Sequence, residues 1–323
     1  LFRDNAIRIL IADDYPISSK VLETYARQWV YDVVCCTNGI HAVELITSPN
    51  GPELAVLDWM MPGLSGLQVC REVRQRTAVS PYVYMILLTA KDRKEDLLEA
   101  LAAGVDDYLT KPYDPHEMKA RLWSGQRILN LQRELITARD ALHIQATHDT
   151  LTGLLNRGAI FDIFERELAR SQRDHTPLSL MLIDIDHFKQ VNDSYGHHCG
   201  DTVLQEVTAR LKGAERLYDR VGRYGGEEFL VVLPGCDLAD ARQVAERMRE
   251  TIAQQPFALS THNLPVTISL GVVSISGSQD THDPDELIRA ADRALYHAKE
   301  RGRNRVEIAA IEELPLARSN RHS

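Results

Sequence analysis

The first 121 residues alternate short apolar runs with amphipathic segments, and this alternation limits the possible folds more than any other feature of the chain. Strands are expected at residues 7–12, 33–36, 54–57, 83–88 and 105–109. Segments of helical period lie between them, at residues 18–30, 67–75 and 94–103. Nearly continuous apolar strands with intervening helices indicate a parallel sheet that is covered on both faces. This part of the chain is therefore predicted to be a doubly wound α/β domain.

Chemically active side chains follow the expected strands. Asp13 and Asp14 come after the first strand, Asp58 after the third, Thr89 after the fourth and Lys111 after the fifth. The carboxyl ends of parallel strands meet at one edge of a sheet, where such domains bind their ligands. The alternative is that the acids only decorate loops. We favour one shared site, because five such residues follow the ends of these strands.

This segment resembles the receiver domain of two-component response regulators over its whole length. The resemblance implies that Asp58 accepts a phosphoryl group from a histidine kinase or another phosphodonor, beside Mg²⁺ (or Mn²⁺) held with Asp13 and Asp14. It assigns contacts with the phosphoryl group to Thr89 and Lys111, and the role of the switch aromatic to Tyr108. It also implies a cis peptide bond between Lys111 and Pro112. Crowded carboxylates need a cation and a lysine to tolerate an added phosphate, which agrees with this assignment.

Residues 115–146 form one long helical stretch without an internal proline after Pro115. A three-then-four spacing of the kind found in coiled coils links Ile128, Leu131, Leu135, Ala138, Leu142 and Gln145. A second series on an adjacent face repeats every seven residues, at Leu122, Leu129 and Ile136. The helix could simply pack one face on its own domains. We favour a parallel homodimer that pairs through this helix and the receiver, and that switches between the two series. The expected domain limits are 1–121, 115–146 for the helical linker, 147–311, and a flexible tail at 312–323.

Two adjacent glycines stand between apolar runs in the sequence Arg223-Tyr-Gly-Gly-Glu-Glu-Phe229 and predict a tight β-hairpin. A turn without side chains, with a carboxylate at its edge, suits a polyphosphate that is held through Mg²⁺. Because successive strand residues point to opposite faces, Glu227 and Glu228 are not expected to face the same partner. Taken alone, these residues favour an ordinary exposed hairpin. The motifs around them reverse that preference.

From Thr147 onward the pattern changes to α+β. Helices are expected at residues 159–171, 202–212, 238–254 and 284–301, with strands at 178–183, 229–233 and 266–275. Asp184 and Asp186 follow an apolar run, and acids two positions apart at a strand end face the same way, as metal ligands do. Asn192 and Asp201 come next, and an amide with a carboxylate can read a guanine edge.

This half resembles the GGDEF family of diguanylate cyclases over its full length. The resemblance rests on several motifs in order: Asp149-x-Leu-Thr-Gly-Leu-x-Asn-Arg157, Asp184-Ile-Asp-His-Phe-Lys189, Gly225-Gly-Glu-Glu-Phe229, Tyr296-x-Ala-Lys299 and Gly302-Arg-Asn304. It implies a palm-like α+β fold and the condensation of two GTP into cyclic di-GMP with release of two pyrophosphates. Each domain would bind one GTP, so two domains would have to face each other.

The resemblance also implies roles for individual residues. The cyclase metal, Mg²⁺ or Mn²⁺, would be held by the carboxylates of Asp184 and Glu227 and by the main-chain oxygen of Ile185. Guanine would be read by Asn192 and Asp201. Phosphate groups would contact Lys299, Arg303 and Lys189. Further substrate contacts are expected from Phe188, His197, Gly225 and Gly226, with Glu228 supporting catalysis.

An inhibitory product-binding site is implied by Arg216-Leu-Tyr-Asp219, which lies just before the hairpin. Arginine can pair bidentately with a guanine edge or a phosphate, and aspartate can accept guanine N–H groups. Arg247, and Arg170 or Arg173, are candidates to complete this site. The alternative is an ordinary surface ion pair, which would contribute little.

Composition excludes some classes of function. The net charge of −9 argues against a nucleic-acid-binding surface. We find no apolar run of transmembrane length and no leader, and five scattered cysteines favour reduced thiols, so we expect a cytoplasmic protein without a membrane partner. Two other functions stay open. One is a catalytically silent receptor for GTP or cyclic di-GMP, and the other is an enzyme that joins ATP with GTP, which Asp201 disfavours.

Overall fold

The structure is a computed structural model that describes residues 7–76, 82–90, 94–214, 218–258, 263–276 and 282–309. The chain divides into two compact units, Leu1–Asp140 and Ala141–Ser323. The boundary between them falls inside one helix, so the predicted domain limits remain predictions. The predicted tail at 312–323 lies outside the described residues.

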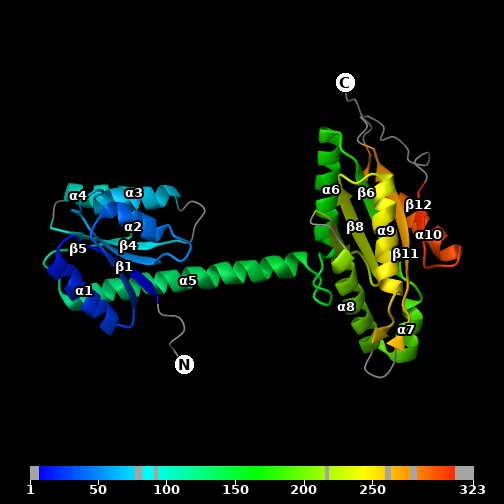
Figure 1. Cartoon of the computed structure of the whole chain (residues 1–323), viewed down its shortest axis with the longest axis horizontal. Coiled ribbons are helices and arrows are strands. Elements are labelled where there is room, and N and C mark those ends of the chain that lie inside the picture. The colour runs from blue at the N-terminus through cyan, green and yellow to red at the C-terminus, as the bar shows by residue number, and fades with distance from the viewer. Residues whose placement is uncertain are drawn as a thin grey trace. The chain divides into compact units, whose positions relative to one another are not determined.

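The first unit contains a five-stranded parallel sheet of order β2-β1-β3-β4-β5 (Figure 1). Its strands are β1 (Arg8–Ala12), β2 (Asp32–Cys36), β3 (Leu54–Asp58), β4 (Tyr84–Thr89) and β5 (Asp107–Thr110). Its helices are α1 (Pro16–Gln28), α2 (Gly39–Ile46), α3 (Gly66–Arg76), α4 (Lys94–Ala102) and the long α5 (Pro115–Thr147). This arrangement confirms the predicted doubly wound fold.

Successive residues of each strand pack in two separate hydrophobic cores, one on each face of the sheet. Ile9 and Ile11 of β1 pack in one core with residues of α1 and α5. Leu10 and Ala12, their neighbours on the same strand, pack in the other core with α2, α3 and α4. Both faces of the sheet are thus covered, which explains why the strands read as nearly continuous apolar runs.

Helix α5 is continuous over 33 residues, and its first part belongs to the core of the first unit. Leu122 and Leu129 are only 1% and 4% exposed, packed with β-strand residues. A Cβ added at Gly125 would lie 2.5 Å from the Tyr84 ring, so only glycine allows this close approach. Arg133 pairs with Glu53. The series Leu122, Leu129, Ile136 is therefore not a second dimer seam, and the predicted switch between two seams was wrong. The spacing was correct, but its first two members are buried against their own domain.

The second unit contains a five-stranded sheet of order β12-β11-β6-β8-β7, antiparallel except for the β11–β12 pair. The strands are β6 (Leu178–Ile185), β7 (Arg220–Arg223), β8 (Glu228–Pro234), β11 (Ile268–Ile275) and β12 (Val306–Ile308). β9 (Phe257–Ala258) and β10 (Asn263–Leu264) pair antiparallel in a separate two-stranded sheet. This mixed sheet confirms the predicted α+β class.

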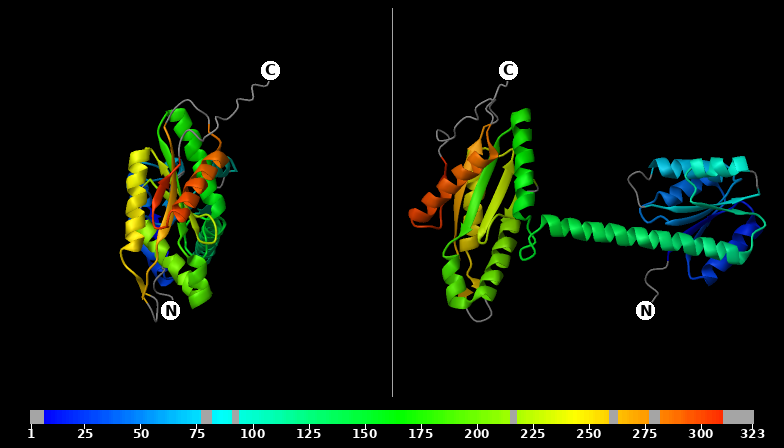
Figure 2. Two further views of the ribbon diagram at one scale, coloured as in Figure 1. Left: turned by 90° about the vertical axis from the view of Figure 1, so that its right-hand side faces the viewer. Right: turned by 180° about the vertical axis from the view of Figure 1, so that it is seen from behind.

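Helices cover both faces of this second sheet. The helices are α6 (Arg157–Asp174), α7 (Phe188–Tyr195), α8 (His197–Ala214), α9 (Leu238–Ala253) and α10 (Pro284–Glu300). One core combines α7, α8 and α9, and the other combines α6 and α10. The left view of Figure 2 shows α9 in yellow on one side of the sheet and α10 in orange-red on the other. In the part of the chain that is described, no helix is both long and apolar enough to cross a membrane.

Candidate functional sites

Three acids and a lysine meet at the carboxyl edge of the first sheet. Carboxylate oxygens of Asp13, Asp14 and Asp58 all lie within 4.8 Å of one another. The Lys111 Nζ atom lies 3.2 Å from Asp13 Oδ2 and 2.9 Å from Asp58 Oδ1. The sequence-based expectation that these strand-end residues share one site thus agrees with the geometry.

The charge balance of this cluster fits a divalent cation. Burial raises the pKa of Asp58, Asp13 raises it further, and Lys111 opposes both effects. Three carboxylates with one lysine leave an excess of negative charge that a hard cation would neutralise. Asp13, which is 0% exposed, also accepts hydrogen bonds from the Tyr15 amide at 2.8 Å and from Ser18 Oγ at 2.7 Å. Sequence reasoning missed Ser18, although a hydroxyl in the first turn of α1, five positions after Asp13, was a usable signal.

The remaining receiver residues lie on neighbouring strands. Thr89 ends β4 and is 4% exposed, and its carbonyl accepts a hydrogen bond from the Lys111 amide at 2.7 Å. Tyr108 on β5 is partly buried against the core beneath α2, α3 and α4. The Lys111–Pro112 peptide bond is cis, as expected.

In the second unit the glycine pair forms the bend of a hairpin. β7 ends at Arg223 and β8 begins at Glu228, which leaves residues 224–227 as the loop. The Tyr224 amide donates to the Glu228 carbonyl at 2.8 Å. A Cβ at Gly225 would lie 2.6 Å from Glu228 Oε2, so a side chain there would disturb that carboxylate. The predicted hairpin is confirmed, with a four-residue loop.

A partly buried ion pair lies beside this hairpin. The Lys299 Nζ atom on α10 lies 2.8 Å from Asp184 Oδ2, and Asp184 is 5% exposed. The Ile185 amide donates to the Glu227 carbonyl at 3.3 Å, which ties the loop to the end of β6. β8 places Glu228 directly opposite Asp184. The two glutamates therefore flank a buried acid that already has a lysine partner.

The carboxylates of this site repel one another. Burial raises the pKa of Glu227 and of Glu228, Asp184 raises both further, and Lys299 lowers both. Burial likewise raises the pKa of Asp184, against Lys299 and Arg303. Both glutamates lie within electrostatic range of Asp184 and Lys299, with Glu228 on β8 and Glu227 in the loop before it. The excess of carboxylates again fits a divalent cation.

Asp186 does not join this cluster as a ligand would. Its carboxylate accepts hydrogen bonds from Thr267 Oγ1 and Ser269 Oγ, both at 2.6 Å, and from the Asn304 amide at 3.0 Å. The expectation that Asp184 and Asp186 serve together was wrong, because β6 ends at Ile185 and the donors beyond it occupy Asp186.

A second ion pair clamps the glycine turn. Arg223 Nη1 lies 3.1 Å from Asp149 Oδ1, and Arg223 Nη2 donates to the Gly226 carbonyl at 2.7 Å. Asp149 also accepts from the amide and hydroxyl of Thr152. Sequence reasoning named Asp149 and Arg223 within motifs without giving either a role.

The predicted guanine-reading residues lie on two consecutive helices, Asn192 on α7 and Asp201 on α8. A Cβ at Gly200 would lie 2.0 Å from Asn192 Oδ1, so this glycine makes room for the amide. Lys189, His197 and Asp201 are exposed. Phe188 is 6% exposed and packs in the core, so its predicted contact with substrate has no direct support.

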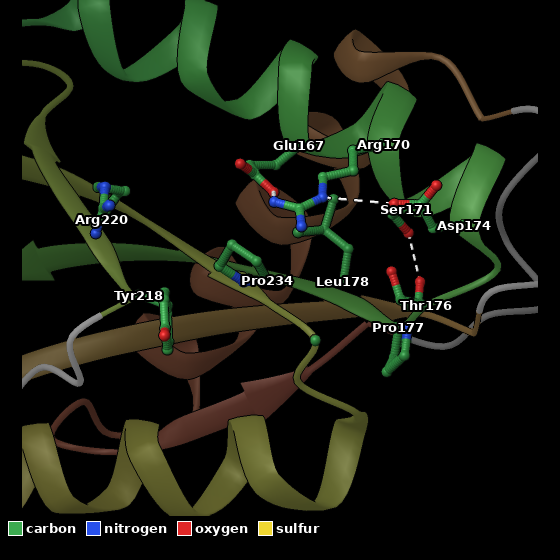
Figure 3. A pocket seen from close by; sticks show the side chains of 11 residues that line it. Glu167, Arg170, Ser171, Asp174, Thr176, Pro177, Leu178, Tyr218, Arg220 and Pro234 are labelled. Atoms are coloured by element: carbon green, nitrogen blue, oxygen red, sulfur yellow. Dashed lines mark hydrogen bonds and ion pairs between the residues drawn. The ribbon is translucent and has the colours of Figure 1, made fainter.

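The predicted inhibitory site is only partly visible, because Arg216 lies outside the described residues. Asp219 is 7% exposed. Arg170 on α6 and Tyr218 line one cavity of about 340 Å³ (Figure 3). In Figure 3, Arg170 lies between Glu167 and Asp174, at N–O distances of 3.9 and 3.5 Å. Arg247 is exposed on α9 and does not line this cavity.

Comparisons with known proteins agree with both halves. Residues 9–123 match the model of the response regulator receiver domain, and residues 146–305 match that of the diguanylate cyclase GGDEF domain. The response regulator PleD of Caulobacter vibrioides is 37% identical over 271 residues, which cover 80% of this chain and 57% of PleD. The chain thus spans little more than half the length of that relative.

Two solved structures are also similar. The diguanylate cyclase SiaD of Pseudomonas aeruginosa, solved with its activator SiaC, is 36% identical with a TM-score of 0.50, covering 60% of this chain and 74% of SiaD. The coiled coil and GGDEF domain of DgcB from Caulobacter crescentus, solved with c-di-GMP, is 29% identical with a TM-score of 0.53. The match covers 59% of this chain and 99% of the DgcB chain. From these matches and the two acidic sites, we conclude that the chain belongs to the GGDEF diguanylate cyclase family and carries a response regulator receiver domain before its GGDEF domain.

Proposed function

We propose that this chain is a diguanylate cyclase that condenses two GTP into cyclic di-GMP under the control of phosphorylation at Asp58. The observation that carries the proposal is the cluster of Asp184, Glu227, Glu228 and Lys299 beside a turn with two glycines. A non-catalytic receptor would not need three repelling carboxylates around a lysine. SiaD, a diguanylate cyclase, and DgcB, solved with c-di-GMP, are similar to this half.

The reaction requires a 3′-hydroxyl oxygen of one GTP to attack the α-phosphorus of the other. A new P–O bond forms while the bond to the β-phosphate breaks, and pyrophosphate leaves with the bonding electrons. We assign the hydroxyl proton to Glu228, whose carboxylate belongs to the residue directly opposite Asp184 and has a pKa that burial raises. Lys299 and Arg303 stabilise the negative charge of the triphosphate. Repeating the step with the roles exchanged closes the ring.

Asp184, Glu227 and the Ile185 carbonyl would hold a magnesium or manganese ion. When bound, this ion would lower the pKa of the attacking hydroxyl and neutralise charge on the leaving group. Lys299 neutralises Asp184 in the structure. Asn192 and Asp201 orient the guanine base, and the exposed Lys189 on α7 and His197 on α8 supply further contacts with the nucleotide.

Two copies of the chain are needed, and the second part of α5 offers a surface on which they could pair. Ile128, Leu131, Leu135 and Leu142 are 44%, 54%, 69% and 65% exposed. These residues keep the three-then-four spacing of a two-stranded coiled coil. We propose a parallel homodimer through this single seam, assisted by the receiver.

Control by the receiver follows from its acidic site. A histidine kinase or another phosphodonor would transfer a phosphoryl group to Asp58, which Lys111 and Thr89 would then stabilise. The GGDEF residues are over a hundred positions away in sequence, so the signal passes through an element with two arrangements. We assign this role to α5 together with the receiver core that packs on it.

Product inhibition is proposed at Arg216 and Asp219, with Arg170 as an additional contact. The support is that Arg170 and Tyr218, next to Asp219, line one cavity. Arg170→Ala should raise the concentration of cyclic di-GMP that gives half-inhibition, with little change in initial rate. Unchanged inhibition in both Arg170→Ala and Arg216→Ala would remove the proposal.

The main test is incubation of the full chain with Mg²⁺ and GTP, with and without a phosphoryl mimic, followed by nucleotide chromatography. We expect cyclic di-GMP and pyrophosphate, more of both with the mimic, and no effect of the mimic in Asp58→Asn. GTP binding without any product would favour the silent receptor, and a mixed product from ATP plus GTP would favour the other enzyme class.

A further inference from the structure

The turn after α10 carries Arg303 in a backbone conformation that residues with side chains rarely adopt. Gly302, Arg303 and Asn304 have φ values of 112°, 62° and 46°. Two consecutive residues other than glycine in the left-handed region are unfavourable by themselves and persist only where surrounding contacts fix them. The contacts that fix this backbone therefore also determine the direction of the Arg303 side chain.

The carboxylate of Asp186 supplies one such contact from inside the protein. It is 6% exposed and accepts the Asn304 amide at 3.0 Å, in addition to the hydroxyls of Thr267 and Ser269 at 2.6 Å. Charge-assisted hydrogen bonds of this kind are stronger than those between neutral groups. Asp186 therefore connects the end of β6, the start of β11 and the turn.

The turn has further supports on its other sides. The Arg303 amide donates to the Ala298 carbonyl at 3.0 Å, and Arg249 Nη1 on α9 donates to Asn304 Oδ1 at 3.0 Å. The Leu270 amide donates to the Arg305 carbonyl at 2.9 Å. Among these contacts between described residues, the one from Asp186 is the contact in which a buried charge holds the backbone of the turn.

The direction of Arg303 depends on that backbone. Arg303 is exposed and lies within electrostatic range of Asp184. We propose that Asp186 is a positioning residue, whose carboxylate holds the Asn304 amide so that Arg303 is aimed at the triphosphate of the nucleotide. This inference rests on the proposed function for the role of Arg303, and it explains why Asp186 is saturated by protein donors.

Equilibrium binding of a non-hydrolysable GTP analogue and of GMP to the full chain provides the test. Asp186→Ala should weaken binding of the analogue about tenfold and leave GMP unchanged, since only the longer phosphate chain reaches Arg303. Asp186→Asn should restore most of the affinity, because its carbonyl can still accept the Asn304 amide. Ser269→Ala is the matched control, because it removes a donor from the other carboxylate oxygen of Asp186. It should leave the affinity for both the analogue and GMP unchanged.

A double-mutant cycle with Arg303→Ala separates positioning from a general structural role. If Asp186 acts through Arg303, the double variant binds the analogue no more weakly than Arg303→Ala alone. Additive losses, or equal losses for GMP, would overturn the proposal. If Asp186→Ala fails to fold, Asp186→Glu replaces it, since it keeps the charge but displaces the acceptor and should still weaken only the analogue.

These outcomes are independent of those for the proposed function. A chain that makes no cyclic di-GMP but shows the non-additive binding cycle keeps the role of Asp186 and loses the proposed reaction. A chain that makes the product but shows additive losses does the reverse.

Discussion

The receiver and the GGDEF domain both combine several carboxylates with one lysine, but they hold these groups differently. In the receiver, Lys111 bridges Asp13 and Asp58, and three carboxylates lie within 4.8 Å of one another. In the GGDEF domain, Lys299 pairs with Asp184 while Glu227 and Glu228 belong to a hairpin. No second group of three acids as close as that in the receiver occurs within the described ranges. The receiver site is thus assembled in advance, whereas the GGDEF site would be completed by cation and nucleotide.

The largest expected effect tests the second half of this comparison. Glu227→Gln removes one ligand charge but keeps the size of the side chain, and should lower cyclic di-GMP formation by about 10²-fold or more, as loss of a key electrostatic group does. Nucleotide chromatography measures the product. Phosphorylation of Asp58 should proceed normally in the same variant, as a control for folding. Turnover near the original rate would remove Glu227 from the cation site.

The link between the two sites is tested by Leu135→Ser with Leu142→Ser. Both side chains are largely exposed in the single chain, so the change should spare each domain but weaken the dimer. We expect stimulation by a phosphoryl mimic to disappear. Analytical sedimentation measures whether the dimer is lost as well. Leu129→Ser is the contrasting variant, because it should instead destabilise the receiver core. Undiminished stimulation in the double variant would exclude the seam.

The free energy of unfolding should depend on pH differently in the cation-bound and cation-free protein. The pKa values of Asp58, Asp184, Glu227 and Glu228 are all raised, chiefly by burial. Between the ordinary carboxyl pKa of about 4 and the raised values, the folded state binds more protons than the unfolded state, so the free energy of unfolding falls as pH rises. Mg²⁺ needs ionised ligands, so its stabilising effect should grow through this window.

Thermal unfolding with and without Mg²⁺ at pH 5 and pH 7.5 measures this difference. At ten times its Kd, the cation adds about 1.4 kcal/mol of stability where the carboxylates are ionised. Asp58→Asn and Asp184→Asn assign the effect to one site or the other. An equal shift by Mg²⁺ at both pH values would contradict the assignment of these acids as ligands.

The most local expected effect concerns the preassembly of the receiver site. Ser18→Ala removes the hydroxyl that donates to Asp13 Oδ2, while Lys111 remains a partner of Oδ2 and the Tyr15 amide a partner of Oδ1. Receiver stability should fall by about 1.5 kcal/mol, typical for a hydrogen bond to a charged group. Denaturant unfolding measures the change. Ser19→Ala is the neighbouring control.

Much of both folds could be predicted from sequence, because apolar runs and helical periods are local properties. Asp58 and Lys111 follow apolar strands, so their shared edge follows from parallel topology alone. Contacts over long separations could not be predicted in this way. Asp186 looks like a second ligand in its motif, but its donors lie 81, 83 and 118 positions away. Likewise, the period of α5 shows that Leu129 is apolar, but not that it faces its own domain.

The packing of α5 has a mechanical consequence. Because Leu122, Gly125 and Leu129 are fixed against the sheet, the helix cannot spin about its own axis unless the receiver core comes apart. Residues 134–147 then extend the receiver as an arm of about 21 Å, at 1.5 Å per residue. A tilt of about 10° at its base would displace the tip by roughly 4 Å, more than the length of a hydrogen bond. We therefore expect a tilt of this helix, rather than a rotation about its own axis, to carry the signal.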